Sequence, residues 1–212
     1  MKSVLLLASG AAVSNVVTLF FSLFITRIYG PEEYGYLGVF TSVIYMFAPA
    51  VALTLPMAIV LAKSEDEAEK ISKLSGMIIL MISVILLVVV YFFEDELLQL
   101  VNAESLGGQG WLVVVAITLA GYFQLNEQWH IRQRGFGTLA KSLNVRAFFI
   151  GISQTLTGLV TATGAALILL YTLGMAAQNI FLYKHREFRK KKNETYTYGT
   201  ILKQYSDFPL YR

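Results

Sequence analysis

The chain has 212 residues, of which 56% are hydrophobic and only 15% are charged. Soluble domains are usually about 45–50% apolar and about 25% charged, and a chain this short has too much surface to hide the excess. The composition therefore excludes an ordinary soluble domain and predicts an integral membrane protein. With no cysteine and only two histidines, the sequence also excludes disulfide frameworks, thiolate metal sites, cysteine nucleophiles and a histidine-rich metal centre.

Six segments are long and apolar enough to cross a membrane. Such a helix requires roughly 20 mainly apolar residues, because the hydrocarbon layer is about 30 Å thick and each residue rises about 1.5 Å. These segments predict an all-α, polytopic membrane protein with spans at 4–28, 37–62, 74–93, 111–129, 145–162 and 165–183. The last two are separated only by Thr163 and Gly164, so the alternative is five long helices, with the C-terminus on the opposite side.

The distribution of Lys and Arg favours six spans with both termini in the cytoplasm. In that topology the cytoplasmic segments hold 16 of the 17 cations, and Arg27 alone lies outside. Five spans would put the eight cations after residue 183 on the outer side, which the positive-inside rule disfavours. We therefore predict a six-helix lobe at 1–183 and a basic, amphipathic cytoplasmic linker at 184–212.

Polar side chains recur at helical spacing in two of the predicted spans, and such residues inside a bilayer point towards protein or a water-filled cavity. The third predicted span, in contrast, is almost wholly aliphatic from 77 to 90 and is expected to face lipid. The two stripes predict a polar cavity, with helix–helix packing as the alternative. The first stripe is Ser14, Thr18, Ser22 and Thr26 with Asn15 beside it, and the second is Ser153, Thr157 and Thr161 with Gln154.

Charged residues gather near the cytoplasmic end of the fourth predicted span. Glu127 is the only acid within a span, and we interpret it as an interfacial acid paired with Arg132 or Arg134, with a proton or cation site as the alternative. Arg132, Arg134, Lys141 and Arg146 crowd one short loop. Such a cluster can bind a diphosphate through charge-assisted hydrogen bonds, or serve only topology and anionic lipid.

Three stretches resemble a known family. Residues 24–38, Phe-Ile-Thr-Arg-Ile-Tyr-Gly-Pro-Glu-Glu-Tyr-Gly-Tyr-Leu-Gly, resemble the R-x-Y/F-G/S-P-E-x-F/Y-G signature of the Wzx-like polysaccharide flippases of the multidrug/oligosaccharidyl-lipid/polysaccharide exporter superfamily. Residues 53–68 and the Tyr-Ser-Asp-Phe-Pro-Leu-Tyr stretch at 205–211 are similar to later motifs of that family. The chain departs from the pattern at Thr54 and Pro56, where the family commonly has Arg and Glu.

The resemblance implies the N-terminal half of an inner-membrane flippase of a bacterial or archaeal cell, because family members usually have twelve to fourteen helices in two similar halves. The implied activity is export of a polyprenyl-diphosphate-linked oligosaccharide for O-antigen, capsule or exopolysaccharide synthesis, without covalent chemistry or cofactor. Membrane lipid and either a C-terminal half or a second copy are the expected partners, and nucleic acid is not. The implied substrate path contains Asn15, Thr18, Ser22, Gln154 and Thr157 for sugar, Arg132, Arg134 and Arg146 for diphosphate, Arg27 at the outer mouth, and Glu127.

Two rival functions stay open. A MATE-like multidrug or cation antiporter requires acids inside the membrane, for which Glu127 is the one candidate. A membrane-bound glycosyltransferase or polymerase requires clustered acids, histidines or metal ligands, and the sequence holds no such cluster.

Overall fold

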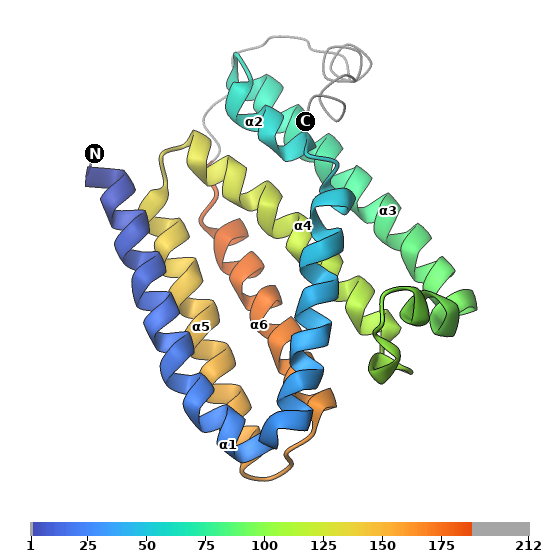
Figure 1. The fold of residues 1–212 in the computed structure, drawn as a ribbon. Helices are drawn as coiled ribbons and strands as arrows, with labels where there is room; N and C mark the ends of the chain where they lie inside the picture. The colour runs from blue at the N-terminus through green and yellow to red at the C-terminus, as the bar shows by residue number, and fades with distance from the viewer. Residues whose placement is uncertain (1, 188–212) are drawn as a thin grey trace.

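The computed structural model describes residues 2–187, without the side chains of 2–6, and this part of the chain is all helical (Figure 1). The long elements are α1 (Lys2–Ala52), α3 (Glu65–Leu100), α4 (Gly110–Arg132), α5 (Phe136–Gly158) and α6 (Gly164–Lys184), with a short α2 (Ala58–Leu61) and 3-10 turns at Leu55–Met57 and Glu104–Leu106. The all-α prediction is confirmed. Three ranges are long and apolar enough to cross a membrane, Leu7–Ala52, Glu65–Leu100 and Gly164–Lys184, which is compatible with a membrane protein.

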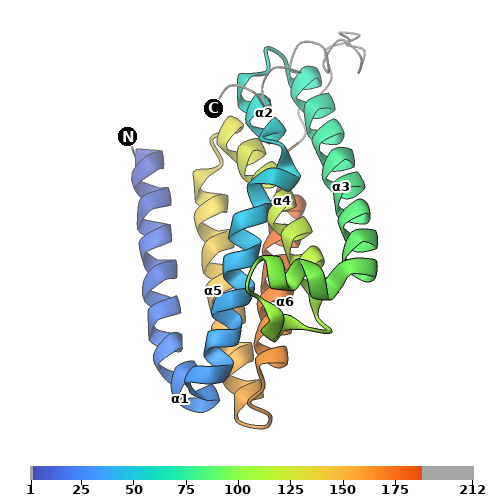
Figure 2. The same ribbon diagram turned by 45° about the vertical axis from the view of Figure 1, so that its right-hand side comes forward.

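Helix α1 is folded back on itself at Gly30, which has a φ of 77° and a ψ of 169°. Glycine adopts this backbone conformation without the steric penalty of a side chain, and Pro31 is pre-set for the first turn of the helix that follows. The first half of α1 (2–29) and the second half (31–52) meet at this turn and diverge away from it (Figures 1 and 2). The sequence predicted two helices with a link at 29–36, whereas a single residue makes the turn.

Several helix ends differ from their predicted positions. The second predicted span was expected to reach residue 62, but α1 ends at Ala52 because Leu53 and Thr54 have positive φ angles and a 3-10 turn follows. Helix α3 begins at Glu65 rather than 74, because a capping box closes its first turn: Ser64 Oγ accepts from the Glu67 N–H (3.1 Å) and the Glu67 carboxylate accepts from the Lys63 N–H (2.7 Å). Polar residues thus extend the helix beyond its apolar part.

The predicted boundaries of the later helices also shift. Helix α5 occupies 136–158 instead of 145–162, and α6 starts at Gly164, so residues 136–184 form two helices and not one long helix. Between the third and fourth predicted spans, α3 bends at Phe93 (φ −132°, ψ 32°) and continues to Leu100. The amphipathic linker from 188 onward and the 205–211 motif lie outside the described residues.

The helices alternate in direction, and the end of α6 lies at the same end of the bundle as the start of α1 (Figures 1 and 2). The main hydrophobic core joins the second half of α1 to α3, α4 and α6 through buried residues such as Phe40, Ile79, Trp129 and Ile168. The first half of α1 instead packs along α5. There the helices approach closely, because a Cβ added at Gly10 would lie 2.3 Å from the Cβ of Ala140.

Large apolar side chains cover much of the outer surface. On α3, Leu80, Met81, Val84 and Val88 are each more than half exposed, on the segment that was expected to face lipid. Exposed apolar surface of this extent is unusual for a soluble monomer and suits a hydrocarbon environment.

Candidate ligand cavity

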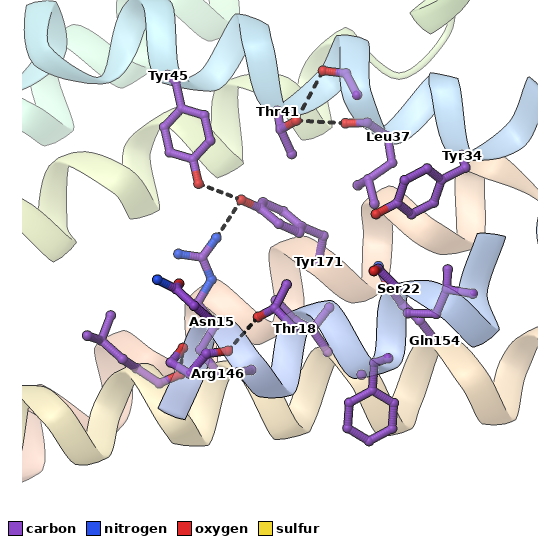
Figure 3. A pocket seen from close by; sticks show the side chains of 18 residues that line it. Asn15, Thr18, Ser22, Tyr34, Leu37, Thr41, Tyr45, Arg146, Gln154 and Tyr171 are labelled. Carbon is purple, nitrogen blue, oxygen red and sulfur yellow. Dashed lines mark hydrogen bonds between the residues drawn. The ribbon is translucent and has the colours of Figure 1, made fainter. Parts of the chain in front are cut away.

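A cavity of about 440 Å³ lies where the two halves of α1 diverge, with α5 and α6 completing its walls (Figure 3). Its size falls within the usual range for small-molecule sites, about 300–1,000 Å³. Most of its side chains are polar, although the surrounding helices are strongly apolar. The polar lining residues are Ser14, Asn15, Thr18, Ser22, Tyr34, Thr41, Tyr45, Arg146, Gln154 and Tyr171.

The wall formed by the first half of α1 presents hydroxyl groups at every fourth residue. Thr18 Oγ1 donates to the Ser14 carbonyl (2.9 Å) and Ser22 Oγ donates to the Leu19 carbonyl (2.8 Å), while Ser14 Oγ reaches α5 and donates to the Leu143 carbonyl (3.2 Å). Because these hydroxyl protons are donated to backbone carbonyls, each hydroxyl can act towards a ligand in the cavity only as a hydrogen-bond acceptor.

A cation, Arg146 of α5, points into the cavity. Its Nη2 donates to the hydroxyl of Tyr171 on α6, and its guanidinium carbon lies 4.8 Å from the centre of that ring. The Tyr171 hydroxyl also shares a hydrogen bond with the Tyr45 hydroxyl of α1 (3.1 Å). The lining includes no Asp or Glu and no other cation. The cavity is therefore positively charged, and the guanidinium has donors to spare for an anion.

Gln154 lies at the junction of three helices and is almost fully buried. Its side-chain Nε2 donates to the Leu167 carbonyl of α6 (2.9 Å), and its backbone carbonyl accepts from the Tyr29 hydroxyl of α1 (2.9 Å). Its amide nitrogen is thus occupied in holding the helices together at the edge of the cavity.

The structure brings together half of the residues predicted for the substrate path. Asn15, Thr18, Ser22, Arg146 and Gln154 all line the cavity, whereas Arg27, Glu127, Arg132, Arg134 and Thr157 do not. Of the latter, Arg27 and Arg134 are exposed, and Glu127, Arg132 and Thr157 are partly buried at other positions.

Arg132 is engaged at the junction between α2 and α3. Its Nη1 donates to the carbonyls of Ile59 (2.9 Å) and Ala62 (2.7 Å), and its Nη2 donates to the Ser64 carbonyl (3.1 Å). Its ion pair is with Glu65 (3.3 Å). The predicted pairing of Glu127 with Arg132 or Arg134 is therefore wrong within residues 2–187, and the arginines of this loop do not converge on one site.

Comparison with models of known protein families, with curated proteins and with solved structures finds no match. The resemblance at 24–38 thus stays a prediction. The structure does give the motif a local role: Gly30 and Pro31 make the turn of α1, and the Glu33 carboxylate accepts a hydrogen bond from the Gly164 N–H at the start of α6.

Arg186, just beyond α6, was counted in the sequence only as one of the basic residues of the linker. Its guanidinium carbon lies 4.6 Å from the centre of the Trp129 ring, and its Nη2 donates to Ser72 Oγ (2.8 Å). Burial lowers the pKa of Arg186 to about 10, so it is still protonated at neutral pH. Through these contacts with Ser72 and Trp129, Arg186 holds the end of α6 against α3 and α4.

Sequence reasoning missed two residues of the cavity's charged centre. Tyr171 and Tyr45 belong to neither of the two polar stripes. The two hydroxyls meet because the second half of α1 packs beside α6, where the Phe40 and Tyr171 rings lie edge to face with centres 6.2 Å apart.

Proposed function

We propose that this chain is a membrane transporter that flips a polyprenyl-diphosphate-linked oligosaccharide across a bacterial or archaeal cell membrane for polysaccharide synthesis. It would act by alternating access and without covalent chemistry. One observation carries the proposal: apolar helices form a cavity, open on one side, whose lining includes ten polar side chains, among them one arginine and no carboxylate. A glycan requires hydroxyl and amide partners, and its lipid-linked phosphate requires a cation.

We further propose that the chain crosses the membrane six times, through the two halves of α1 and through α3, α4, α5 and α6, with both ends cytoplasmic. Helices α4 and α5 have 23 residues each, about 34 Å of helix, which is enough to span the hydrocarbon layer. They are less apolar than the others because they carry polar residues of the cavity and the bundle interior. The alternating helix directions support this topology (Figure 1). The Lys and Arg distribution supports it as well, although Lys141 and Arg146, counted as cytoplasmic in the sequence, fall within α5.

In this assignment Arg146 is the cation that meets the phosphate, in place of the arginine cluster expected from the sequence. Asn15, Thr18 and Ser22 would meet sugar hydroxyls along the opposite wall. Asn15, Thr18 and Tyr45 are exposed on the open side of the cavity. Polar groups at membrane depth are costly when they face lipid, so we infer that a C-terminal half or a second copy covers this side.

The cavity favours this function over the antiporter. An organic cation requires an acid at its site, and the lining of the described cavity contains none, while Glu127 lies elsewhere.

An export assay tests the proposal. The gene carrying Arg146→Gln is expressed in a host that lacks its own exporter of the same glycan, and surface polysaccharide is measured alongside the amount of protein in the membrane. Arg134→Gln is the matched control, because it removes the same charge from an exposed residue outside the cavity. We expect Arg146→Gln to lose export and Arg134→Gln to retain it. Export by Arg146→Gln at the wild-type level would exclude the cavity as the substrate path.

A further inference from the structure

The hydrogen bonds of Arg146 form a chain that crosses the cavity. In Figure 3 the guanidinium rises from α5 to the Tyr171 hydroxyl, which in turn meets the Tyr45 hydroxyl from the second half of α1. Three helices are thus joined through one phenol oxygen. Within residues 2–187 this oxygen is the only hydrogen-bond partner found for the Arg146 side chain.

The partner is a weak one for a guanidinium. The Tyr171 hydroxyl accepts a single N–H of the guanidinium, whereas an oxyanion can accept two parallel N–H bonds and carries a charge. Hydrogen bonds to ionised partners are roughly twice as strong as those between neutral groups. An oxyanion that enters the cavity would therefore outcompete the Tyr171 hydroxyl for Arg146. An anion that pairs with the Nη2 N–H now bonded to Tyr171 takes the position of that hydroxyl, so the Tyr171 ring has to shift.

Such a shift would also break the bond to Tyr45. The two hydroxyl oxygens are 3.1 Å apart, near the upper limit for an O–H···O bond, so a displacement of about 0.5 Å is enough to lose it. Tyr45 belongs to a part of α1 that is easily deformed. Pro49 has no N–H for the Tyr45 carbonyl four residues earlier, and Gly30 breaks the helix at its other end.

The two halves of α1 have different main packing partners, and the clusters that hold them meet near the turn, where Leu37 packs against both. The second half of α1 belongs to the main core with α3, α4 and α6, while a smaller cluster, Ile25, Tyr29 and Leu167, holds the first half of α1 beside the turn. A bond across the open part of the cavity can therefore set the separation of the walls without disrupting either core.

We propose that the Tyr171 hydroxyl is an internal stand-in for the ligand's oxyanion, and that its displacement from Arg146 releases Tyr45 and lets the two halves of α1 move apart. The inference rests on the proposed function in one respect, that the cavity binds an anion. It assigns Tyr171 and Tyr45 as the residues that couple binding to movement.

The test uses spin labels on the full chain in lipid nanodiscs. Because the sequence has no cysteine, Leu19→Cys and Met46→Cys place one label on each half of α1, at exposed positions. The distance distribution between the labels is measured by pulsed electron resonance, without ligand and with geranyl diphosphate, and geraniol serves as the uncharged probe. Binding is measured on the same samples, with Arg146→Gln as the site-loss variant.

Geranyl diphosphate, and not geraniol, should lengthen the label distance in the wild type. Tyr171→Phe and Tyr45→Phe should each give the longer distance without ligand. Tyr171→Phe should also bind the diphosphate about tenfold more tightly, because no hydroxyl competes for Arg146. Tyr91→Phe is the matched control, since it removes a hydroxyl from an exposed tyrosine on α3 outside the cavity; it should behave as wild type.

The outcomes separate the two proposals. Binding that depends on Arg146 but leaves the label distance unchanged would overturn the stand-in role and leave the anion site intact. Absence of diphosphate binding would overturn the proposed site and the stand-in role with it. If Tyr171→Phe fails to fold, Tyr45→Phe still decides the coupling, because it leaves the bond between Arg146 and Tyr171 in place.

Discussion

Replacing Arg132 should weaken the fold rather than the binding of a ligand. The guanidinium makes three hydrogen bonds to carbonyls at the junction of α2 and α3, and an ion pair with Glu65. These carbonyls belong to a segment where regular helix is interrupted. In Arg132→Gln the buried carbonyls of Ile59 and Ala62 would lose their charged donor.

The expected loss follows from these contacts. A hydrogen bond to a charged group contributes about 1.5–3 kcal/mol, and an ion pair with a partner as exposed as Glu65 contributes about 0–1 kcal/mol. Water can replace the bond at the partly buried Ser64, and bonds that share one guanidinium are not additive. We therefore expect Arg132→Gln to cost about 3 kcal/mol. Arg132→Lys, which keeps the charge but not the planar fork, should cost about half of that.

Thermal unfolding in detergent measures the loss through tryptophan fluorescence, to which the buried Trp129 and the exposed Trp111 contribute, and hydrogen exchange at 59–64 locates it. Arg134→Gln is the control, because it removes the same charge two residues away from an exposed side chain. Its stability should be within about 0.5 kcal/mol of the wild type. Equal stability of the Arg132→Gln and Arg134→Gln proteins would refute the role given to the carbonyl bonds.

Two further changes test the turn of α1 and its contact with α6. Gly30→Ala should cost about 1–3 kcal/mol in unfolding free energy, because the backbone conformation of Gly30 is almost exclusive to glycine. Gly35→Ala is the control and should cost nothing, because Gly35 is helical and, like Gly30, has open space around its Cβ position. Glu33→Ala should cost about 1 kcal/mol by leaving the Gly164 N–H uncapped, with the exposed Glu32→Ala as control, and an equal melting temperature for the two alanine variants would contradict this cap.

The helices were predictable where the chain is long and apolar, since a run of about 20 such residues has few alternatives to a helix. Their ends were less predictable, because polar residues outside the apolar run extend α3 and α5. The capping box of Ser64 and Glu67 is a local pattern and could have located the start of α3 from the sequence. The one-residue turn at Gly30 could not be located in this way, since a longer loop suits the same residues.

The candidate site was predictable to the extent that one helix face carries it. The four-residue spacing of Ser14, Thr18 and Ser22 placed them on one face, and the structure puts that face on the cavity. The arginines show the opposite case. Arg132 and Arg146 look alike in the sequence, but three carbonyls brought together by the tertiary fold engage Arg132, whereas Arg146 meets a single phenol.

The geometry of the turn explains why one polar stripe serves both packing and a cavity. Close to Gly30 the halves of α1 are near each other, and Ile25 and Tyr29 are buried there with Leu167. Farther from the turn the halves diverge, and Ser14 to Ser22 line open space instead of another helix. The angle set at Gly30 thus determines how much of the stripe is free for a ligand, and the bond between Tyr45 and Tyr171 joins the second half of α1 to α6 beside this open part.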